Sequence, residues 1–272
     1  MQPPPNPARR NRNIGTSKQG HGQNNRLVIP KLSTSLPACT AQLNVAETIC
    51  KKVGSKDVWV IVEKTSGGCI HACSVDDILH LLWLIPSADW AGLNTFVLRQ
   101  STKKTRILSP AWGRLFYYAE LGVRGSKAVR RGPAIFIEAV NIDRAIRWST
   151  ALDPEDAEEL ERLRTDGHTI TREGKRYTIS SSVAAVRATQ LYRTLPHEIG
   201  HWFDWLTKVE EPFARGEKFT SLSESYFARP NSEREAFAHR YADDLRRGLQ
   251  AYGAIPFAQI EHEVAGQIRD EF

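Results

Sequence analysis

The chain has 272 residues, of which 41% are hydrophobic and 25% are charged, and its formal net charge is +6 at pH 7. This length and apolar content predict a globular protein with a buried core, and they exclude a wholly disordered chain. No apolar run approaches the 18 residues that a membrane-spanning helix needs, and the N-terminus lacks the basic-then-apolar pattern of a secretory signal. We therefore expect a cytoplasmic protein that does not enter a membrane.

The positive charge is confined to the start of the chain. Residues 1–46 contain six bases and no acid, which accounts for the whole excess of 37 Lys and Arg over 31 Asp and Glu. The stretch is also rich in Pro, Asn, Gln and Gly, a composition that cannot bury enough apolar surface to become ordered. We predict a disordered basic tail over residues 1–45. It is expected to be a solvated leader, touching nucleic acid at most weakly through residues 1–31.

Four cysteines are present, and two of them suggest a metal. Cys69 and Cys73 have a C-x3-C spacing with His71 between them. Structural zinc sites usually combine two such pairs, and the chain has no second one. Ordinary reduced cysteines are therefore the favoured interpretation.

The first part of the folded chain mixes helices and strands. The elements that the patterns predict here are a helix at 45–53, a strand at 57–65, a helix from Ser74 (its N-cap) to Pro86, and strands at 94–100, 105–109 and 133–140. The stretch WGRLFYYAEL at 112–121 fits a strand or a helix equally well.

The second part is mostly helical. The elements predicted here are a helix that Asp153 caps and Gly167 ends, a hairpin at 169–180, and helices at 183–193, 197–207, 233–249 and from 256 onward, with a break at Pro196. Strands that come first and helices that come last indicate an α+β domain. We assign it to residues 46–272, with an N-terminal portion at 46–90 and a catalytic core at 91–272.

The stretch TLPHEIGHWFDWL at 194–206 contains the main chemical signal. His197 and His201 are one helical turn apart, so both imidazoles face the same side and one metal ion can bridge them. Glu198 lies one step around the helix, where it can take a proton from an attacking water and return it to a leaving amine. The alternative is two ordinary histidines on an amphipathic helix.

Two neighbours support the metal interpretation. Gly200 lies inside the helix, where it costs about 1 kcal/mol relative to alanine, a cost that makes sense if another backbone approaches closely. Asp204 shares the face of the two histidines and could accept a hydrogen bond that orients one imidazole. The alternative for Asp204 is a solvent-facing acid.

A catalytic zinc site needs a third protein ligand, and no remaining histidine has a suitable spacing. The downstream helix offers Glu235, at the head of a face lined by alanines that would allow a close helix–helix contact. Two alternatives stay open. Glu235 and Ser232 could form a capping box instead, and Glu233 is a rival ligand on a different face.

HEIGHWFDWL together with EAFAHRY resembles the gluzincins, the zincins whose third ligand is a glutamate. The pattern is most similar to lethal-factor-like and ImmA/IrrE-type metallopeptidases over residues 194–245. The resemblance implies a zincin-like fold, with a small mixed sheet packed on the HExxH helix and a following helix that bears the glutamate. It implies Zn²⁺ on His197, His201 and Glu235, with Glu198 as base. It also implies a tyrosine that stabilises the oxyanion. The candidate is Tyr226, nine residues before Glu235 where the family has seven.

These observations favour a zinc endopeptidase that acts on a protein or peptide target. In zincins a sheet-edge strand before the active helix binds the substrate, and residues 134–139 could be that strand or an ordinary buried one. The alternative function is a regulatory zinc-binding module without activity, or a nucleic-acid-associated factor of a mobile element that acts through the basic tail. The intact Glu198 argues against an inactive module.

Overall fold

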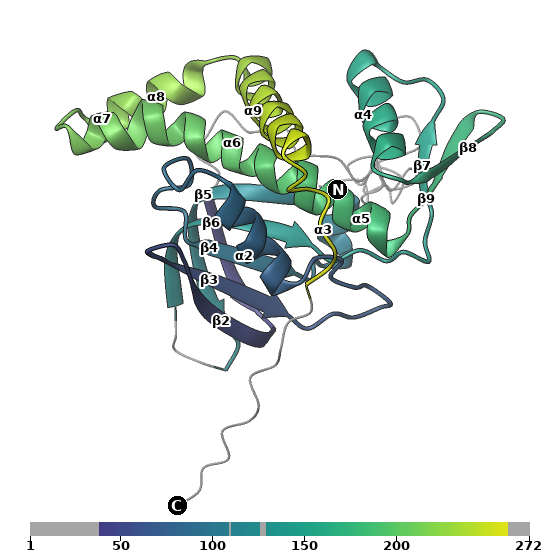
Figure 1. The fold of residues 1–272 in the computed structure, drawn as a ribbon, viewed down its shortest axis with the longest axis horizontal. Coiled ribbons are helices and arrows are strands. Elements are labelled where there is room, and N and C mark those ends of the chain that lie inside the picture. The colour runs from purple at the N-terminus through teal and green to yellow at the C-terminus, as the bar shows by residue number, and fades with distance from the viewer. Residues whose placement is uncertain (1–37, 109, 126–128, 261–272) are drawn as a thin grey trace, which may run out of the picture.

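A curved six-stranded sheet lies beneath helices from the second half of the chain in the computed structural model (Figure 1). The structure describes residues 38–108, 110–125 and 129–260. The strands are β1 (Ala38–Leu43), β2 (Val45–Val53), β3 (Lys56–Glu63), β4 (Thr95–Arg99), β5 (Gly113–Val123) and β6 (Val129–Glu138), in the spatial order β1-β5-β6-β4-β3-β2. The pairs β2/β3 and β5/β6 are antiparallel, and β1/β5, β3/β4 and β4/β6 are parallel. The expected α+β class is confirmed.

The sheet includes segments that the sequence patterns assigned differently. Residues 45–53 form strand β2 rather than the predicted helix, because Gly54, with φ +62°, allows a two-residue turn that pairs Val53 with Lys56. The ambiguous stretch at 112–121 is mostly strand β5. Strand β1 begins at Ala38, so the folded part reaches into the segment predicted to be a tail; residues 1–37 lie outside the described residues.

The boundary near residue 90, between the N-terminal portion and the catalytic core of the predicted domain, falls within one sheet that contains β2 and β3 together with β4 to β6. Helix α2 (Val75–Leu84) covers one face of this sheet, and a capping box between Ser74 and Asp77 starts it, as its sequence predicts. Residues 103–108 form the short helix α3 (Lys103–Leu108) instead of the predicted strand. Its start is fixed by the Thr102 hydroxyl, which accepts a hydrogen bond from the Thr105 amide.

A smaller unit lies beside the main sheet and contains the predicted hairpin. Its elements are β7 (Ile146–Ser149), β8 (Thr169–Glu173), β9 (Arg176–Ser180) and α4 (Pro154–Thr165). Asp153 caps α4 as predicted, with its carboxylate accepting from the Asp156 amide. Trp148, Leu163 and Ile179 form the centre of a separate core beneath the hairpin. Figure 1 shows this unit on the same side of the sheet as α6 and α9.

One nearly unbroken helical run carries the histidines. It consists of α5 (Val183–Thr189), the π-helical turn η2 (Gln190–Thr194), α6 (Leu195–Trp205), the π-helical turn η3 (Leu206–Glu210) and α7 (Glu211–Ala214). The predicted break at Pro196 does not occur. In η2 the Leu195 amide donates to the Gln190 carbonyl five residues back, and this extra residue accommodates a proline that has no N–H to donate.

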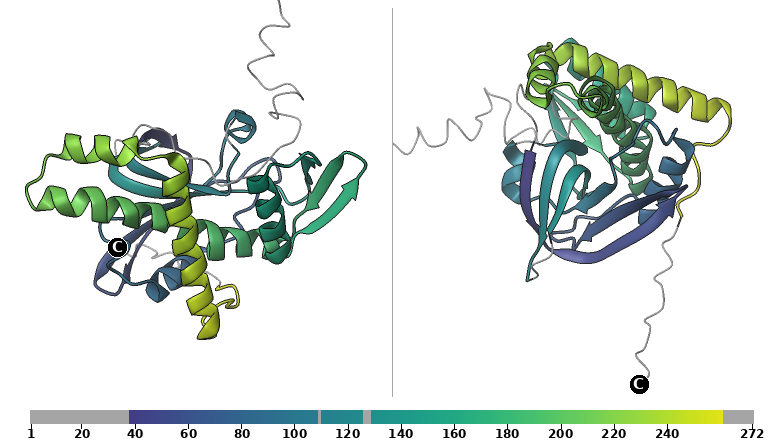
Figure 2. Two further views of the ribbon diagram at one scale, coloured as in Figure 1. Left: turned by 90° about the horizontal axis from the view of Figure 1, so that it is seen from above. Right: turned by 90° about the vertical axis from the view of Figure 1, so that its left-hand side faces the viewer.

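Two more helices complete the layer above the sheet, α8 (Phe219–Ala228) and α9 (Asn231–Ala251). Helix α9 contains the predicted helix at 233–249 and crosses α6, as the view from above shows (Figure 2). The helix predicted from 256 is absent over 256–260, where the Ile260 amide instead donates to Asp77; residues 261–272 lie outside the described residues. No helix in the described ranges has the length and apolar content to cross a bilayer.

Gln190 fixes the helical run against the sheet. Its side-chain amide, 1% exposed, donates to the Glu138 carbonyl at 2.7 Å and to the Trp112 carbonyl at 3.2 Å. These carbonyls stand at the end of β6 and just before β5. The first turn of α6 therefore has a defined position over the start of β5.

We expect Gln190→Leu to lower the free energy of unfolding by about 1–3 kcal/mol, because it leaves a buried carbonyl without its donor. Gln250→Leu is the control, since Gln250 is exposed on α9. Urea unfolding followed by circular dichroism measures both. Equal stabilities of the two variants would contradict this role for Gln190.

Candidate metal centre

Helix α6 is buried along nearly its whole length, and its polar side chains are buried with it. His197, His201 and Asp204 are at most 1% exposed, and Glu198 is 3% exposed. Trp202 and Trp205 of the same helix lie in the main core. A helix that buries four ionisable groups bears a large desolvation cost, which is typical of a functional site.

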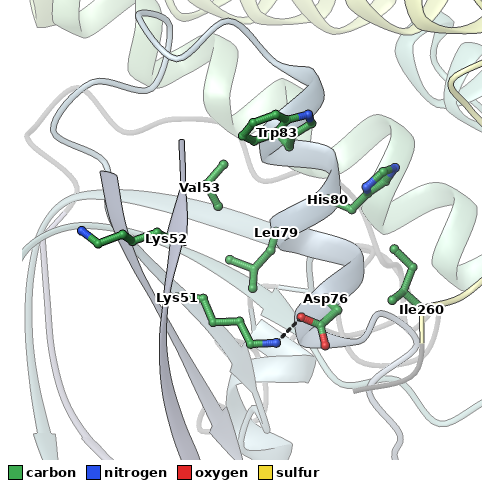
Figure 3. Close-up of a pocket in the computed structure, with 8 residues that line it drawn as sticks. All are labelled: Lys51, Lys52, Val53, Asp76, Leu79, His80, Trp83 and Ile260. Carbon is green, nitrogen blue, oxygen red and sulfur yellow. Dashed lines mark hydrogen bonds and ion pairs between the residues drawn. The ribbon is translucent and has the colours of Figure 1, made fainter. Parts of the chain in front are cut away.

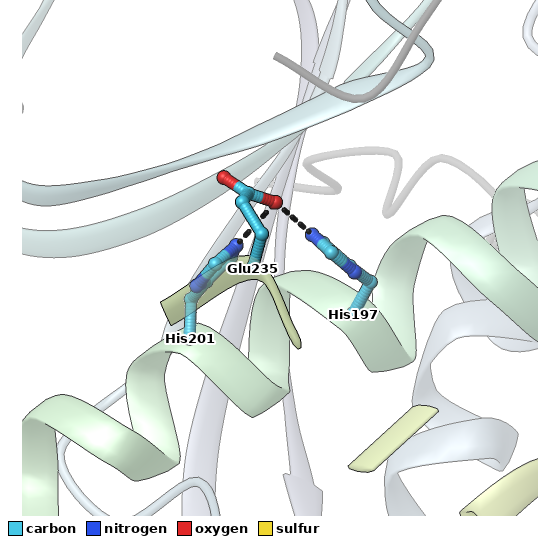
Figure 4. A group of neighbouring side chains, drawn as sticks. All are labelled: His197, His201 and Glu235. Carbon is cyan, nitrogen blue, oxygen red and sulfur yellow. Dashed lines mark ion pairs between the residues drawn. The ribbon is translucent and has the colours of Figure 1, made fainter. Parts of the chain in front are cut away.

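The two histidines meet Glu235 of α9 at one point (Figure 4). The Nε2 atoms of His197 and His201 lie 3.4 and 3.5 Å from Glu235 Oε2. Ligand atoms about 2.1 Å from a tetrahedral zinc ion are about 3.4 Å apart, so these separations suit a shared ion. One ligand atom from each residue lies within 4.8 Å of the others. This group can hold a metal ion.

The donor atoms are available to a metal. Among the described residues, both Nε2 atoms are buried without a hydrogen-bond partner, since their separation from Glu235 is too long for a well-formed bond. Burial, together with the neighbouring His201 and His239, lowers the pKa of His197 to about 3. His197 is therefore neutral at pH 7, with a lone pair to offer. The Glu235 side chain is 17% exposed, so solvent reaches the group from the side on which Glu235 lies.

Glu198 lies beside this group and outside it. Its Oε2 accepts a hydrogen bond from the Leu115 amide of β5 at 2.8 Å, whereas its buried Oε1 has no partner in the described part of the chain. Burial raises the pKa of Glu198 to about 7. A carboxyl group with one free oxygen and this pKa can both accept and release a proton near neutral pH.

The structure distinguishes the two candidate third ligands. Helix α9 begins at Asn231 with no capping side-chain hydrogen bond, so the alternative of a capping box between Ser232 and Glu235 does not apply. Glu233 is 57% exposed and accepts from Arg229 at 2.9 Å, away from the histidines. Glu235 is the acid that joins them.

Asp204 and Tyr226 do not take the positions that the sequence suggested. Asp204 does not orient a histidine, because both Nδ1 atoms lack a hydrogen-bond partner among the described residues; it accepts instead from Arg229, Lys208 and Tyr226. Tyr226 is 2% exposed, and its hydroxyl also contacts the Tyr117 hydroxyl at 3.2 Å. Its role as an oxyanion donor stays a prediction, and in this arrangement its hydroxyl is already engaged.

The strand that reaches the site is β5 rather than β6. Residues 134–139 lie largely within β6, which has β5 on one side and β4 on the other, so it has no free edge for a substrate. Over its described residues, Ala38–Leu43, strand β1 pairs with Tyr118–Val123. Among the described strands, none covers Gly113–Tyr117 of β5 on that side, and this is the segment whose Leu115 amide meets Glu198.

Sequence patterns also missed His239. This residue is one turn beyond Glu235 on α9, and its ring centroid lies 4.4 Å from that of His197. The Arg162 guanidinium of α4 lies 3.4 Å from its Nδ1, which connects the smaller unit to the site. The spacing Glu235-x3-His239 was a usable signal, because it places both side chains on one helical face.

A separate pocket lies between β2 and α2, lined by Lys51, Leu79, His80, Trp83 and their neighbours (Figure 3). None of the residues of the metal centre lines it. The group of His197, His201 and Glu235 therefore lies outside this pocket.

Gly200 explains how α9 comes so close to α6. A Cβ at this position would lie 3.0 Å from Tyr241 Cδ1 and 3.1 Å from Ala238 Cα, closer than ordinary packing allows. Ala238 and Ala242 are buried on the facing side of α9. The backbone approach that the glycine suggested is confirmed.

We expect the chain to bind about one zinc ion, and Glu235→Ala to weaken its affinity strongly because two imidazoles alone leave the ion under-coordinated. Glu233→Ala should change the affinity by only a few fold, since its carboxylate faces solvent. Competition with a chromophoric chelator measures both. The opposite order would make Glu233 the ligand.

Gly200→Ala should weaken zinc affinity by about tenfold, because the added methyl pushes α9 and Glu235 away from the histidines. Gly248→Ala is the matched control on α9, where a Cβ would meet nothing within 4 Å. The control should keep its affinity and gain up to about 1 kcal/mol of stability from helix propensity. Unchanged zinc affinity in Gly200→Ala would contradict the close-contact explanation.

Comparison with known proteins gave no match, either to a family model, to a curated protein or to a solved structure. The assignment of this site therefore depends on its own geometry: two buried histidines and a glutamate that can share a metal ion, with a buried carboxyl group beside them.

Proposed function

We propose that this chain is a zinc-dependent endopeptidase of the gluzincin type with a zincin-like fold. The observation that carries the proposal is the convergence of His197, His201 and Glu235 on one point while Glu198, on the same helix, keeps a free carboxylate oxygen beside it. Three ligands that leave a coordination position open are typical of catalytic rather than structural zinc.

The metal-binding residues and Glu198 have separate roles in the proposed peptide hydrolysis. His197, His201 and Glu235 would hold the zinc ion, which when bound polarises a substrate carbonyl and makes water more acidic. Glu198 takes the proton of the attacking water on Oε1 and passes it to the leaving amine. The Leu115 amide fixes the other oxygen of Glu198, so the carboxylate keeps one orientation during the transfer.

We place the substrate along Gly113–Tyr117, the part of the β5 edge that no described strand covers. An extended peptide that pairs with Gly113–Tyr117 gains backbone hydrogen bonds regardless of its side chains. Since the Leu115 amide lies 2.8 Å from Glu198, a peptide bond on this edge is delivered to the catalytic carboxylate. This replaces the substrate strand predicted at 134–139.

The proposal places the activity in the cytoplasm. All four cysteines, Cys39, Cys50, Cys69 and Cys73, are free thiols in the structure. Free thiols are the usual state of cysteines in a reducing compartment.

We expect the zinc-loaded protein to cleave members of a proteome-derived peptide library, and Glu198→Gln to lower the rate by about 10² to 10⁴ while it keeps its metal, because an amide cannot accept the proton. Mass spectrometry of newly formed N-termini identifies the cleaved bonds. Glu217→Gln is the control, since it makes the same chemical change at an exposed position.

A chelator should abolish cleavage by the wild type. Wild-type protein that retains zinc but cuts no peptide or co-expressed protein would favour a non-catalytic zinc-binding module. Cleavage that Glu198→Gln leaves intact would rule out Glu198 as the base.

A further inference from the structure

Glu235 reaches the histidines from the second turn of α9, so whatever fixes the start of α9 also fixes this ligand. We infer that the buried Asp204–Arg229 ion pair is a positioning device that sets Glu235 against His197 and His201. The inference rests on the proposed metal site and names the residues that hold its third ligand in place.

The pair connects the two helices of the site. Asp204 belongs to α6, three residues beyond His201, and its Oδ2 accepts from Arg229 Nη1 at 2.7 Å. Arg229 lies in the turn just before α9, six residues ahead of Glu235. Its Nε also donates to Glu233 Oε1 at 2.9 Å, in the first turn of α9. Arg229 therefore joins the end of α6 to the beginning of α9.

The two ion pairs of Arg229, with Asp204 and with Glu233, differ in burial. The Asp204 side chain is 0% exposed, whereas that of Glu233 is 57% exposed. Water and salt screen the exposed pair with Glu233. The buried carboxylate of Asp204 instead depends on its few partners and holds them in a strict geometry. Lys208 and Tyr226 are its other partners. The ion pair with Asp204 is therefore the one that restrains α9.

The described start of α9 lacks a capping side chain. Its N-cap is Pro230, and no side-chain capping bond is present there. Instead, the fully buried Arg234 lies over the rings of Tyr226 and Phe227, at 5.6 and 5.1 Å from their centroids, and Nη1 reaches the Tyr226 carbonyl at 3.4 Å. The corner between α8 and α9 is thus packed against the same tyrosine that contacts Asp204.

The far end of α9 contains a matched control. Arg246 donates to Asp166 at 3.1 Å, with side-chain exposures of 20% and 0%, against 19% and 0% for Arg229 and Asp204. Each aspartate keeps other partners when its arginine is lost, since Asp166 also accepts from Arg193 and Thr189. The two pairs differ in their separation from Glu235 along the chain. Arg229 is six residues before Glu235, whereas Arg246 is eleven residues beyond it.

The test compares Arg229→Gln with Arg246→Gln in the full chain. The readouts are zinc affinity, by competition with a chromophoric chelator, and urea unfolding of the metal-free proteins. We expect Arg229→Gln to weaken zinc affinity by about 10–100-fold, the usual cost of losing an outer partner of a ligand. Arg246→Gln should change it by less than about threefold, because distant sites act independently. The visible spectrum of bound Co²⁺ should change only in Arg229→Gln.

A second pair of variants applies if a glutamine variant does not fold. Arg229→Lys keeps the charge but cannot make both bonds of the guanidinium, so its zinc affinity should lie between those of wild type and Arg229→Gln, whereas Arg246→Lys should match wild type. Equal zinc affinities at the two positions, at matched stability, would overturn the inference while leaving the metal site intact. Failure of the wild type to bind zinc would instead refute the proposed function.

Discussion

The close contact between α6 and α9 is the constraint on which the site depends. The two histidines come from one helix and the glutamate from another, so the distance between the helices decides whether the three donors can share an ion. Gly200 and Ala238 let the backbones approach until even a methyl group would be crowded. At that separation both imidazoles lie about as far from Glu235 as two ligands of one tetrahedral ion lie from each other.

The second constraint is the burial of polar groups on α6, and each is accommodated in a different way. His197 loses its charge, because burial lowers its pKa. Glu198 receives one amide hydrogen bond and has a raised pKa. Asp204 keeps cationic partners in Arg229 and Lys208. These arrangements leave the two imidazole Nε2 atoms and Oε1 of Glu198 without partners among the described residues, so these atoms are available to a metal ion or a proton.

Local spacing was enough to predict the metal group. His197 and His201 are one turn apart, and the alanine-lined face behind Glu235 indicated a close partner helix. Longer-range features could not be read this way. Arg229, the partner of Asp204 that precedes α9, is 25 residues away in sequence, and nothing local distinguishes it from other arginines. The part of β5 that no described strand covers depends on where β1 pairs along it, and sequence alternation carries no information about that pairing.

Two local errors also have physical causes. A proline inside a helical pattern normally ends the helix. At Pro196 the helix continues, because the π-helical turn before it leaves no hydrogen bond that would require the N–H that proline lacks. Residues 45–53 have a helical spacing of apolar side chains, yet pairing with β3 through a glycine turn makes them a strand. At residues 45–53 the pairing with a neighbouring strand therefore overrode the local preference for helix.

The central claim is that one zinc ion is held by two imidazoles and a carboxylate, with no cysteine. X-ray absorption at the zinc K-edge of the zinc-loaded protein tests it most directly. We expect nitrogen and oxygen neighbours at about 2.0–2.2 Å with the multiple-scattering pattern of two imidazoles. A sulfur neighbour at about 2.3 Å, or a spectrum without imidazole, would contradict it.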